Sequence, residues 1–89
     1  MSVTHEGHVH YESNVLSALD SAAAPMTSAA IAAMILRLAG EPPTGRNMRR
    51  TTQHVRRHLR RFKAQGLVRE IRTKGNRFIG WILTDKLLR

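Results

Sequence analysis

The hydrophobic period of this chain changes at Gly66, and that change constrains the fold more than any other feature. Before the glycine, apolar residues recur every three or four positions, as on one face of an α-helix; after it they alternate, which is typical of β-strands. The pattern predicts a helix over residues 47–65 that Gly66 ends, followed by a β-hairpin over residues 68–84. Lys74-Gly75-Asn76 is predicted to form its turn, since Gly and Asn suit positive φ.

The residues before this unit predict two further helices. Residues 13–24 carry an apolar stripe at helical spacing, with Ser13 as the N-cap and Pro25 as the stop. A second helix should begin after Thr27 and end at Gly40, and the loop that follows, residues 41–45, holds two prolines. Its predicted apolar stripe is Ile31, Met34, Ile35 and Leu38.

Three helices followed by a hairpin predict an α+β fold. A chain of 89 residues suits one domain, which we expect over residues 13–89, after a flexible arm over residues 1–12. The chain has no cysteine, which excludes disulfides and thiolate metal sites. The most apolar stretch, residues 26–39, is shorter than the roughly 20 residues that cross a bilayer, and the N-terminus lacks a signal-peptide pattern. We therefore expect a cytoplasmic protein without a membrane partner.

Most of the positive charge lies in residues 46–77. This block carries twelve of the fifteen Lys and Arg residues and one acid, Glu70, for a formal charge of +11 in a chain of net charge +9. Such an uneven distribution attracts a polyanion, and nucleic-acid phosphate is the usual one. Arg outnumbers Lys by twelve to three. The planar guanidinium suits phosphate and guanine better than an ammonium does.

The helix over residues 47–65 has one apolar and one basic face, as follows from a rotation of 100° per residue. The sector expected to be buried comprises Met48, Val55, Leu59 and Phe62. The opposite side comprises Arg50, Gln53, Arg57, Arg60 and Arg61, with Arg49 and Arg56 on one flank and His54 on the other. A merely solvated basic face is the simplest alternative. However, like charges three or four residues apart repel, and no acid on this helix offsets them, which favours a partner that supplies negative charge.

Residues 51–68 resemble the recognition helix and following strand of winged helix-turn-helix transcriptional regulators, with the MarR and ArsR groups nearest. The likeness lies in Val55, Leu59 and Phe62 followed by Gly66-Leu67-Val68, and in the closing Trp81-Ile82-Leu83-Thr84, which is similar to the end of a wing. It covers about residues 13–84. The predicted turn after Gly40 is longer and richer in proline than in those domains.

The resemblance implies a double-stranded DNA binder, nucleoid-associated in the cytoplasm, with residues 47–65 in the major groove and residues 68–84 as the wing. It implies base-reading roles for Thr52, Gln53, His54, Arg56 and Arg57; within these, Gln53 suits adenine and Arg57 suits guanine. It implies phosphate contacts for Arg46, Arg49, Arg50, Arg60 and Arg61. The implied wing contacts are Arg72, Lys74, Asn76 and Arg77.

Several alternatives stay open at this point. A structured-RNA binder and a protein-interaction module that docks an acidic partner both fit a basic winged domain. Pairing of two copies through residues 13–24 and the C-terminal tail is also open, although no heptad repeat is present. His5, His8 and His10 have the composition of a metal cluster, but a polar arm is the simpler interpretation.

We expect no cofactor and no enzymatic activity, because no acid pair, catalytic triad or phosphate-binding glycine loop is evident. His58, at the edge of the buried seam, is expected to be a packed or hydrogen-bonded histidine. Phe78 and Trp81 are expected to pack in the core, with base stacking as the alternative.

Overall fold

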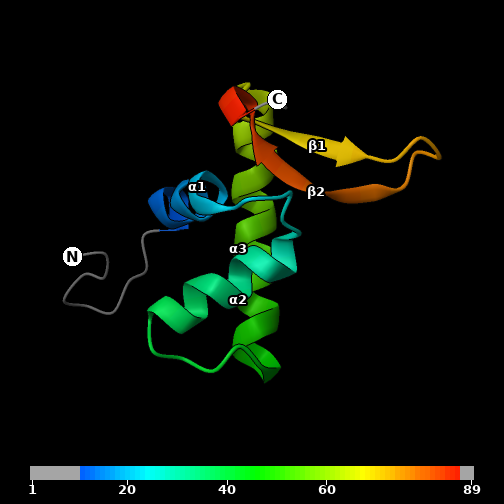
Figure 1. Ribbon diagram of the computed structural model, residues 1–89. Coiled ribbons are helices and arrows are strands. Elements are labelled where there is room, and N and C mark those ends of the chain that lie inside the picture. The colour runs from blue at the N-terminus through cyan, green and yellow to red at the C-terminus, as the bar shows by residue number, and fades with distance from the viewer. Residues whose placement is uncertain (1–10, 87–89) are drawn as a thin grey trace.

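The structure, a computed structural model, describes residues 11–86, which form three helices followed by a β-hairpin (Figure 1). The elements are α1 (Tyr11–Ser21), α2 (Ser28–Leu38), α3 (Gly45–Ala64), β1 (Val68–Arg72), β2 (Phe78–Leu83) and a short 3₁₀ helix, η1 (Thr84–Lys86). In Figure 1, α2 crosses α3, and the hairpin extends sideways from the C-terminal end of α3. The predicted α+β fold is confirmed, and this layout is consistent with a winged-helix-like fold.

The second helix begins and ends where the sequence predicts. The Thr27 hydroxyl accepts a hydrogen bond of 3.1 Å from a backbone N–H in the first turn of α2 and so caps it. At the other end, Gly40 has a φ of 77°, and the N–H groups of Gly40 and Glu41 donate to the carbonyls of Arg37 and Leu36. This pair of bonds is a Schellman motif, which needs the left-handed conformation that glycine adopts without strain.

The prediction for the first helix was wrong at both ends. α1 begins at Tyr11, so Ser13 lies inside the helix and is not its N-cap. The helix ends at Ser21 instead of continuing to residue 24. The Ser21 hydroxyl donates to two carbonyls of the preceding turn, a local bond that competes with helix continuation. Residues 22–25 then carry the chain to β2, where Met26 pairs with Trp81.

The third helix begins two residues earlier than predicted. It covers Gly45–Ala64 rather than residues 47–65, so the loop after α2 is shorter than expected. Thr44 is extended, with φ −140° and ψ 164°, and Gly45 has a φ of 64°. Glycine at this point lets the chain turn from the two prolines directly into the helix. Gly66 ends α3 as predicted, with a φ of 78° and the same pair of hydrogen bonds as at Gly40.

The hairpin has the predicted antiparallel pairing, but its second strand stops at Leu83 rather than residue 84. The Thr84 N–H and hydroxyl instead donate to the carbonyls of Leu67 and Gly66, which fixes the end of β2 against the end of α3. At the tip, Asn76 has a φ of 66°, whereas Gly75 does not take positive φ as the sequence had suggested. Asn tolerates this conformation better than most residues with a Cβ.

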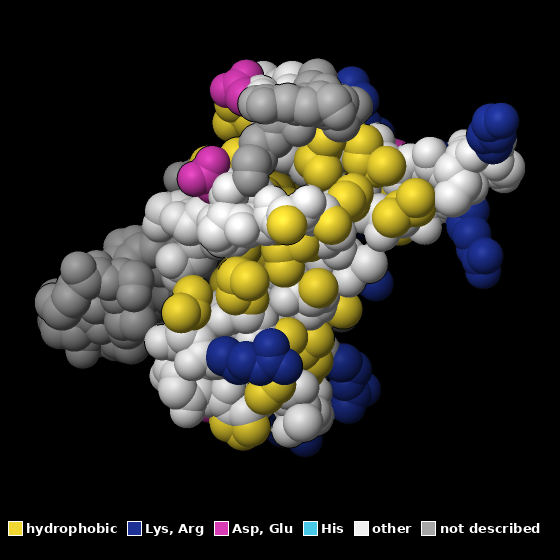
Figure 2. Space-filling model, in the orientation of Figure 1, with side chains coloured by type: hydrophobic (Ala, Val, Ile, Leu, Met, Phe, Trp, Pro, Cys, Tyr) yellow, Lys and Arg dark blue, Asp and Glu magenta, His cyan; other side chains and the backbone are white. Residues whose placement is uncertain are grey.

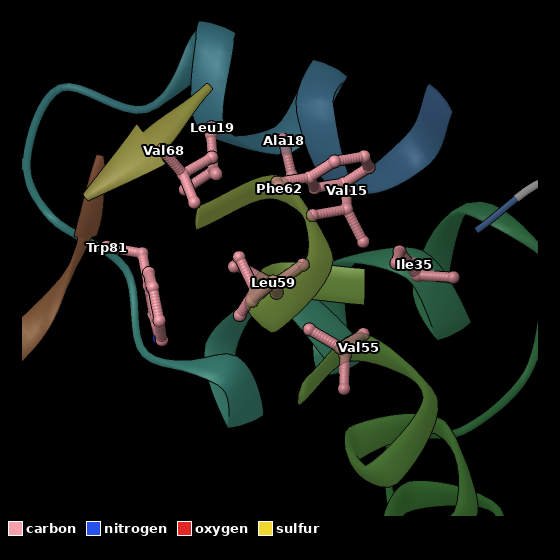
Figure 3. Close-up of a cluster of buried hydrophobic side chains, with 11 residues drawn as sticks. Val15, Ala18, Leu19, Ile35, Val55, Leu59, Phe62, Val68 and Trp81 are labelled. Atoms are coloured by element: carbon pink, nitrogen blue, oxygen red, sulfur yellow. The ribbon is translucent and has the colours of Figure 1, made fainter. Parts of the chain in front are cut away.

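The core lies where the three helices meet the base of the hairpin (Figure 3). Its largest fully buried side chains include Phe62, Leu59 and Val55 from α3, as predicted. Its members are Val15, Ala18, Leu19, Ile31, Ala32, Ile35, Val55, Leu59, Phe62, Val68 and Trp81. These residues come from every helix and both strands, so the core fixes the direction in which α3 presents its other face.

Four predicted core positions differ in the structure. Leu38 is 72% exposed, because the last turn of α2 extends past α3, and Ala32 and Leu36 are buried instead. Met34 and Met48 are only half-buried, and the buried position at the start of the α3 stripe belongs to Thr51. Phe78, the first residue of β2 and so at its tip end, is 37% exposed.

His58 and Trp81 pack as predicted. Nδ1 of His58 lies 2.9 Å from the His54 carbonyl oxygen, and its ring tilts against Phe62. Trp81 is buried in the core. Over residues 11–86, no helix combines the length and the apolar character needed to cross a bilayer.

Candidate nucleic-acid interface

The outer face of α3 is exposed and basic. Thr51, Val55, Leu59 and Phe62 turn inward, and this inward stripe fixes which side chains turn outward. The exposed side chains of the helix include Arg46, Arg49, Arg50, Gln53, Arg56, Arg57, Arg60 and Arg61. All five predicted phosphate-binding arginines are therefore on the surface, as are Gln53 and Arg57.

The remaining predicted base-reading residues have different surroundings. The Thr52 side chain is half-buried, and its hydroxyl donates to the Met48 carbonyl at 2.7 Å, so it is already bonded to its own helix. His54 is also half-buried. Arg56 is exposed but turns toward α2, where its Nε lies 3.4 Å from the Ser28 hydroxyl oxygen. Gln53 and Arg57 are thus the best-presented of the five.

The arginines of this face have little internal compensation. Arg46, Arg49, Arg50, Arg57 and Arg60 make no ion pair with any carboxylate in the part of the chain that the structure describes. Like charges spaced four apart on a helix destabilise it by about 0.2–0.5 kcal/mol for each pair, and Arg46 with Arg50 is one such pair. Folding therefore leaves this positive charge on the surface at a small cost in stability.

A groove of about 450 Å³ lies between the C-terminal half of α3 and the inner face of the hairpin. Its cationic lining consists of Arg56, Arg60, Lys63 and Arg72. One wall carries the aromatic rings of Phe78 and Trp81, which meet edge to face at 6.0 Å. The groove thus combines four positive charges with an apolar surface.

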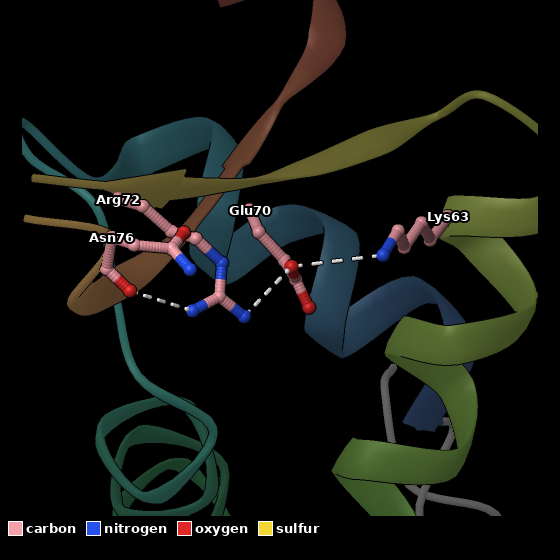
Figure 4. Close-up of polar contacts among 4 residues, drawn as sticks. All are labelled: Lys63, Glu70, Arg72 and Asn76. Atoms are coloured by element: carbon pink, nitrogen blue, oxygen red, sulfur yellow. Dashed lines mark hydrogen bonds and ion pairs between the residues drawn. The ribbon is translucent and has the colours of Figure 1, made fainter. Parts of the chain in front are cut away.

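One carboxylate lies inside this groove. Oε1 of Glu70 is 3.6 Å from Nζ of Lys63 and 3.2 Å from Nη2 of Arg72 (Figure 4). Arg72 also donates from Nη1 to the Asn76 carbonyl at 3.3 Å, and its guanidinium lies over the Phe78 ring at 5.6 Å. Arg72, predicted as a wing contact, is therefore held at the side of the hairpin by three partners.

The other predicted wing residues occupy the hairpin tip. Lys74, Asn76 and Arg77 are exposed, and the tip extends well away from the helices (Figure 1). In Figure 2, Lys and Arg side chains stand at this tip and along the side of the molecule below it, whereas the two most prominent acidic patches lie toward α1 and η1. Most of the basic surface seen in this view is therefore separated from these acidic patches.

Sequence reasoning missed two residues of this interface, Lys63 and Ser28. Lys63 could have been found from its spacing, since it lies three residues after Arg60 on the same side of α3. Ser28 had no sequence signal, because its contact with Arg56 joins residues 28 positions apart. His5, His8 and His10 lie outside the described residues.

Comparison with known proteins adds no family to these observations. No protein-family model matches the chain, and no curated protein and no solved structure matches it.

Proposed function

We propose that this chain binds double-stranded DNA and acts as a small transcriptional regulator of the winged helix-turn-helix type. The observation that carries the proposal is the exposed guanidinium face of α3, opposite a buried stripe. On this face Arg46, Arg49, Arg50, Arg57 and Arg60 make no ion pair with a carboxylate of residues 11–86. A duplex supplies one negative charge per about 1.7 Å of its axis, which is the compensation that this face lacks.

The dimensions of α3 support binding in the major groove. Twenty residues at a rise of 1.5 Å make a helix about 30 Å long, and a helix fits the major groove, which is about 12 Å wide. In this arrangement Gln53 and Arg57 meet base edges, while the arginines toward each end of α3 contact phosphates. The hairpin tip contacts the flanking backbone or minor groove.

The proposal is tested by measuring the affinity for a duplex as a function of salt. If about 6 phosphates are neutralised, log K falls against log salt with a slope near −5. A slope shallower than about −2 would overturn the proposal.

A matched pair of variants separates a specific face from general attraction. Arg50→Gln and Arg37→Gln remove the same charge from exposed positions, on α3 and α2 respectively. Arg50→Gln should weaken duplex binding and flatten the salt slope by about 0.9, whereas Arg37→Gln should change both much less. Equal effects would mean that only net charge matters.

Selection of bound duplexes from a random pool tests the regulatory role. An enriched sequence supports a regulator, and two-fold symmetry within it supports binding as a homodimer. A competition experiment with structured RNA tests the alternative partner. Displacement of the duplex by RNA at equal concentration would favour RNA as the partner.

A further inference from the structure

Glu70 is the one acid of the basic block, and the fold places it inside the groove between α3 and the hairpin. Its pairing with Trp81 across the hairpin puts its side chain on the face of the sheet that turns toward α3. There it lies between Lys63 from the helix and Arg72 from the strand (Figure 4). A single carboxylate thus bridges the two elements that the proposed function assigns to DNA.

The bridge is built from contacts that an external anion can replace. The side chain of Glu70 is 25% exposed, and those of Lys63 and Arg72 are 55% and 41% exposed. Ion pairs at such accessible positions are weak, because water solvates both partners well. A phosphate oxygen accepts the same hydrogen bonds from guanidinium and ammonium groups as a carboxylate oxygen does.

The groove retains positive charge beyond what Glu70 neutralises. Arg56 and Arg60 line it as well, so four cations face one carboxylate. Ser28, the first residue of α2, also lines it and brings the positive end of a helix dipole to the same space. A phosphate that entered would therefore meet cations on both sides of the position that Glu70 occupies.

We propose that this groove is a binding site for a phosphodiester of bound duplex DNA, and that Glu70 is an internal competitor that occupies it in the free protein. The inference rests on the proposed function. A phosphodiester that enters takes Lys63 and Arg72 as partners and displaces the carboxylate toward solvent. Glu70 lowers the affinity for DNA in general, so that sequences which make good base contacts are favoured over random ones.

Glu70→Gln tests this competition. The variant keeps the size of the side chain and removes its charge, and we expect it to bind a fixed duplex about 3–10-fold more tightly with a salt slope steeper by about 0.9. The matched control is Asp20→Asn, which removes the same charge from an exposed position on α1, an element to which the proposed function assigns no DNA contact. The control should change affinity by less than about twofold. Thermal unfolding of each variant establishes that it is folded.

Lys63→Met supplies a second readout through a double-mutant cycle. Because Glu70 acts through Lys63 and Arg72, the gain from Glu70→Gln should shrink when Lys63 is already replaced. Equal gains from Glu70→Gln and Asp20→Asn, or weaker binding by Glu70→Gln, would overturn the proposal. Weaker binding would mean that the carboxylate positions the hairpin instead of competing with phosphate.

Failure of the proposed function can be told apart from failure of this inference. If the wild-type chain binds no duplex, the function fails, and the groove is then tested with inorganic pyrophosphate. NMR signals of the Arg72 guanidinium and the Trp81 indole should shift at lower pyrophosphate concentration in Glu70→Gln than in the wild type. Identical titrations, or no shift in either protein, would reject the competition at this groove.

Discussion

The backbone of Met26 passes so close to Gly80 that a Cβ added to Gly80 would lie 2.9 Å from the Met26 nitrogen. The approach is enforced by two hydrogen bonds between Met26 and Trp81, of 3.1 and 2.8 Å, which make Met26 a one-residue third strand beside β2. This contact joins the segment between α1 and α2 to the hairpin. It therefore helps to set the position of the hairpin relative to α3.

We predict that Gly80→Ala destabilises the protein by about 2 kcal/mol or more, because Met26 contributes rigid backbone atoms to the clash. The matched control is Gly75→Ala at the hairpin tip, where the nearest atom would be 3.9 Å from the new Cβ. Chemical denaturation of the two variants checks the prediction. Equal stability of Gly80→Ala and Gly75→Ala would show that Met26 does not lie against β2.

Thr27 and Thr44 both precede a helix, but their side chains should contribute differently to the free energy of unfolding. We predict that Thr27→Ala costs about 1 kcal/mol, because the hydroxyl of Thr27 caps α2. Thr44 also precedes a helix, but its side chain makes no capping hydrogen bond to α3. Thr44→Ala should therefore change the free energy of unfolding by less than about 0.5 kcal/mol. A larger loss at Thr44 than at Thr27 in urea denaturation would contradict the structure at both helix starts.

The leucines Leu59 and Leu38 test where the core lies. Leu59 is fully buried in α3, so Leu59→Ala should cost about 3 kcal/mol through lost burial and a cavity. Leu38 is exposed at the end of α2, and its replacement should be within about 0.5 kcal/mol of the wild type. The melting temperatures of the two variants and the wild type check this prediction. A marked fall in the melting temperature of Leu38→Ala would point to a partner that covers this residue.

Arg57 and Arg49 test the proposed division of labour along α3. Both are exposed and lack carboxylate partners within residues 11–86, so replacing either should leave stability nearly unchanged. Arg57→Ala should relax sequence preference at one base pair, with a loss of about 1–3 kcal/mol for the preferred site, whereas Arg49→Ala should weaken all duplexes alike. Binding to a panel of single-substitution duplexes distinguishes the two patterns. If Arg57→Ala weakened binding to all duplexes equally, Arg57 would not be a base-reading residue.

Local features of the structure were predictable because neighbouring residues determine them. Thr27, Gly40 and Gly66 mark helix ends through bonds that close within one turn, and the sequence places all three correctly. The inward direction of Val55, Leu59 and Phe62 also follows from helical spacing alone, and with it the outward direction of Arg57.

Other features were decided by tertiary contacts. After α1 ends at Ser21, residues 22–25 bring Met26 to β2, and the hydrophobic pattern of residues 13–24 carries no trace of that pairing. Leu38 fits the apolar stripe of α2, yet it is exposed because that stripe extends past α3. Helical periodicity determines which residues share a face of the helix. How much of that face is buried depends on the length and position of the element packed against it.

The sequence by itself determined that the chain has three helices, a hairpin and a basic face on α3, since spacing and end signals act over a few residues. The tertiary structure alone decided which charges lie together. Glu70 of β1 meets Lys63 of α3, and Arg56 turns to Ser28, because the packing of the hairpin and α2 against α3 brings these groups within reach. Charge interactions depend on distance in space, and distances between separate elements are set by how those elements pack.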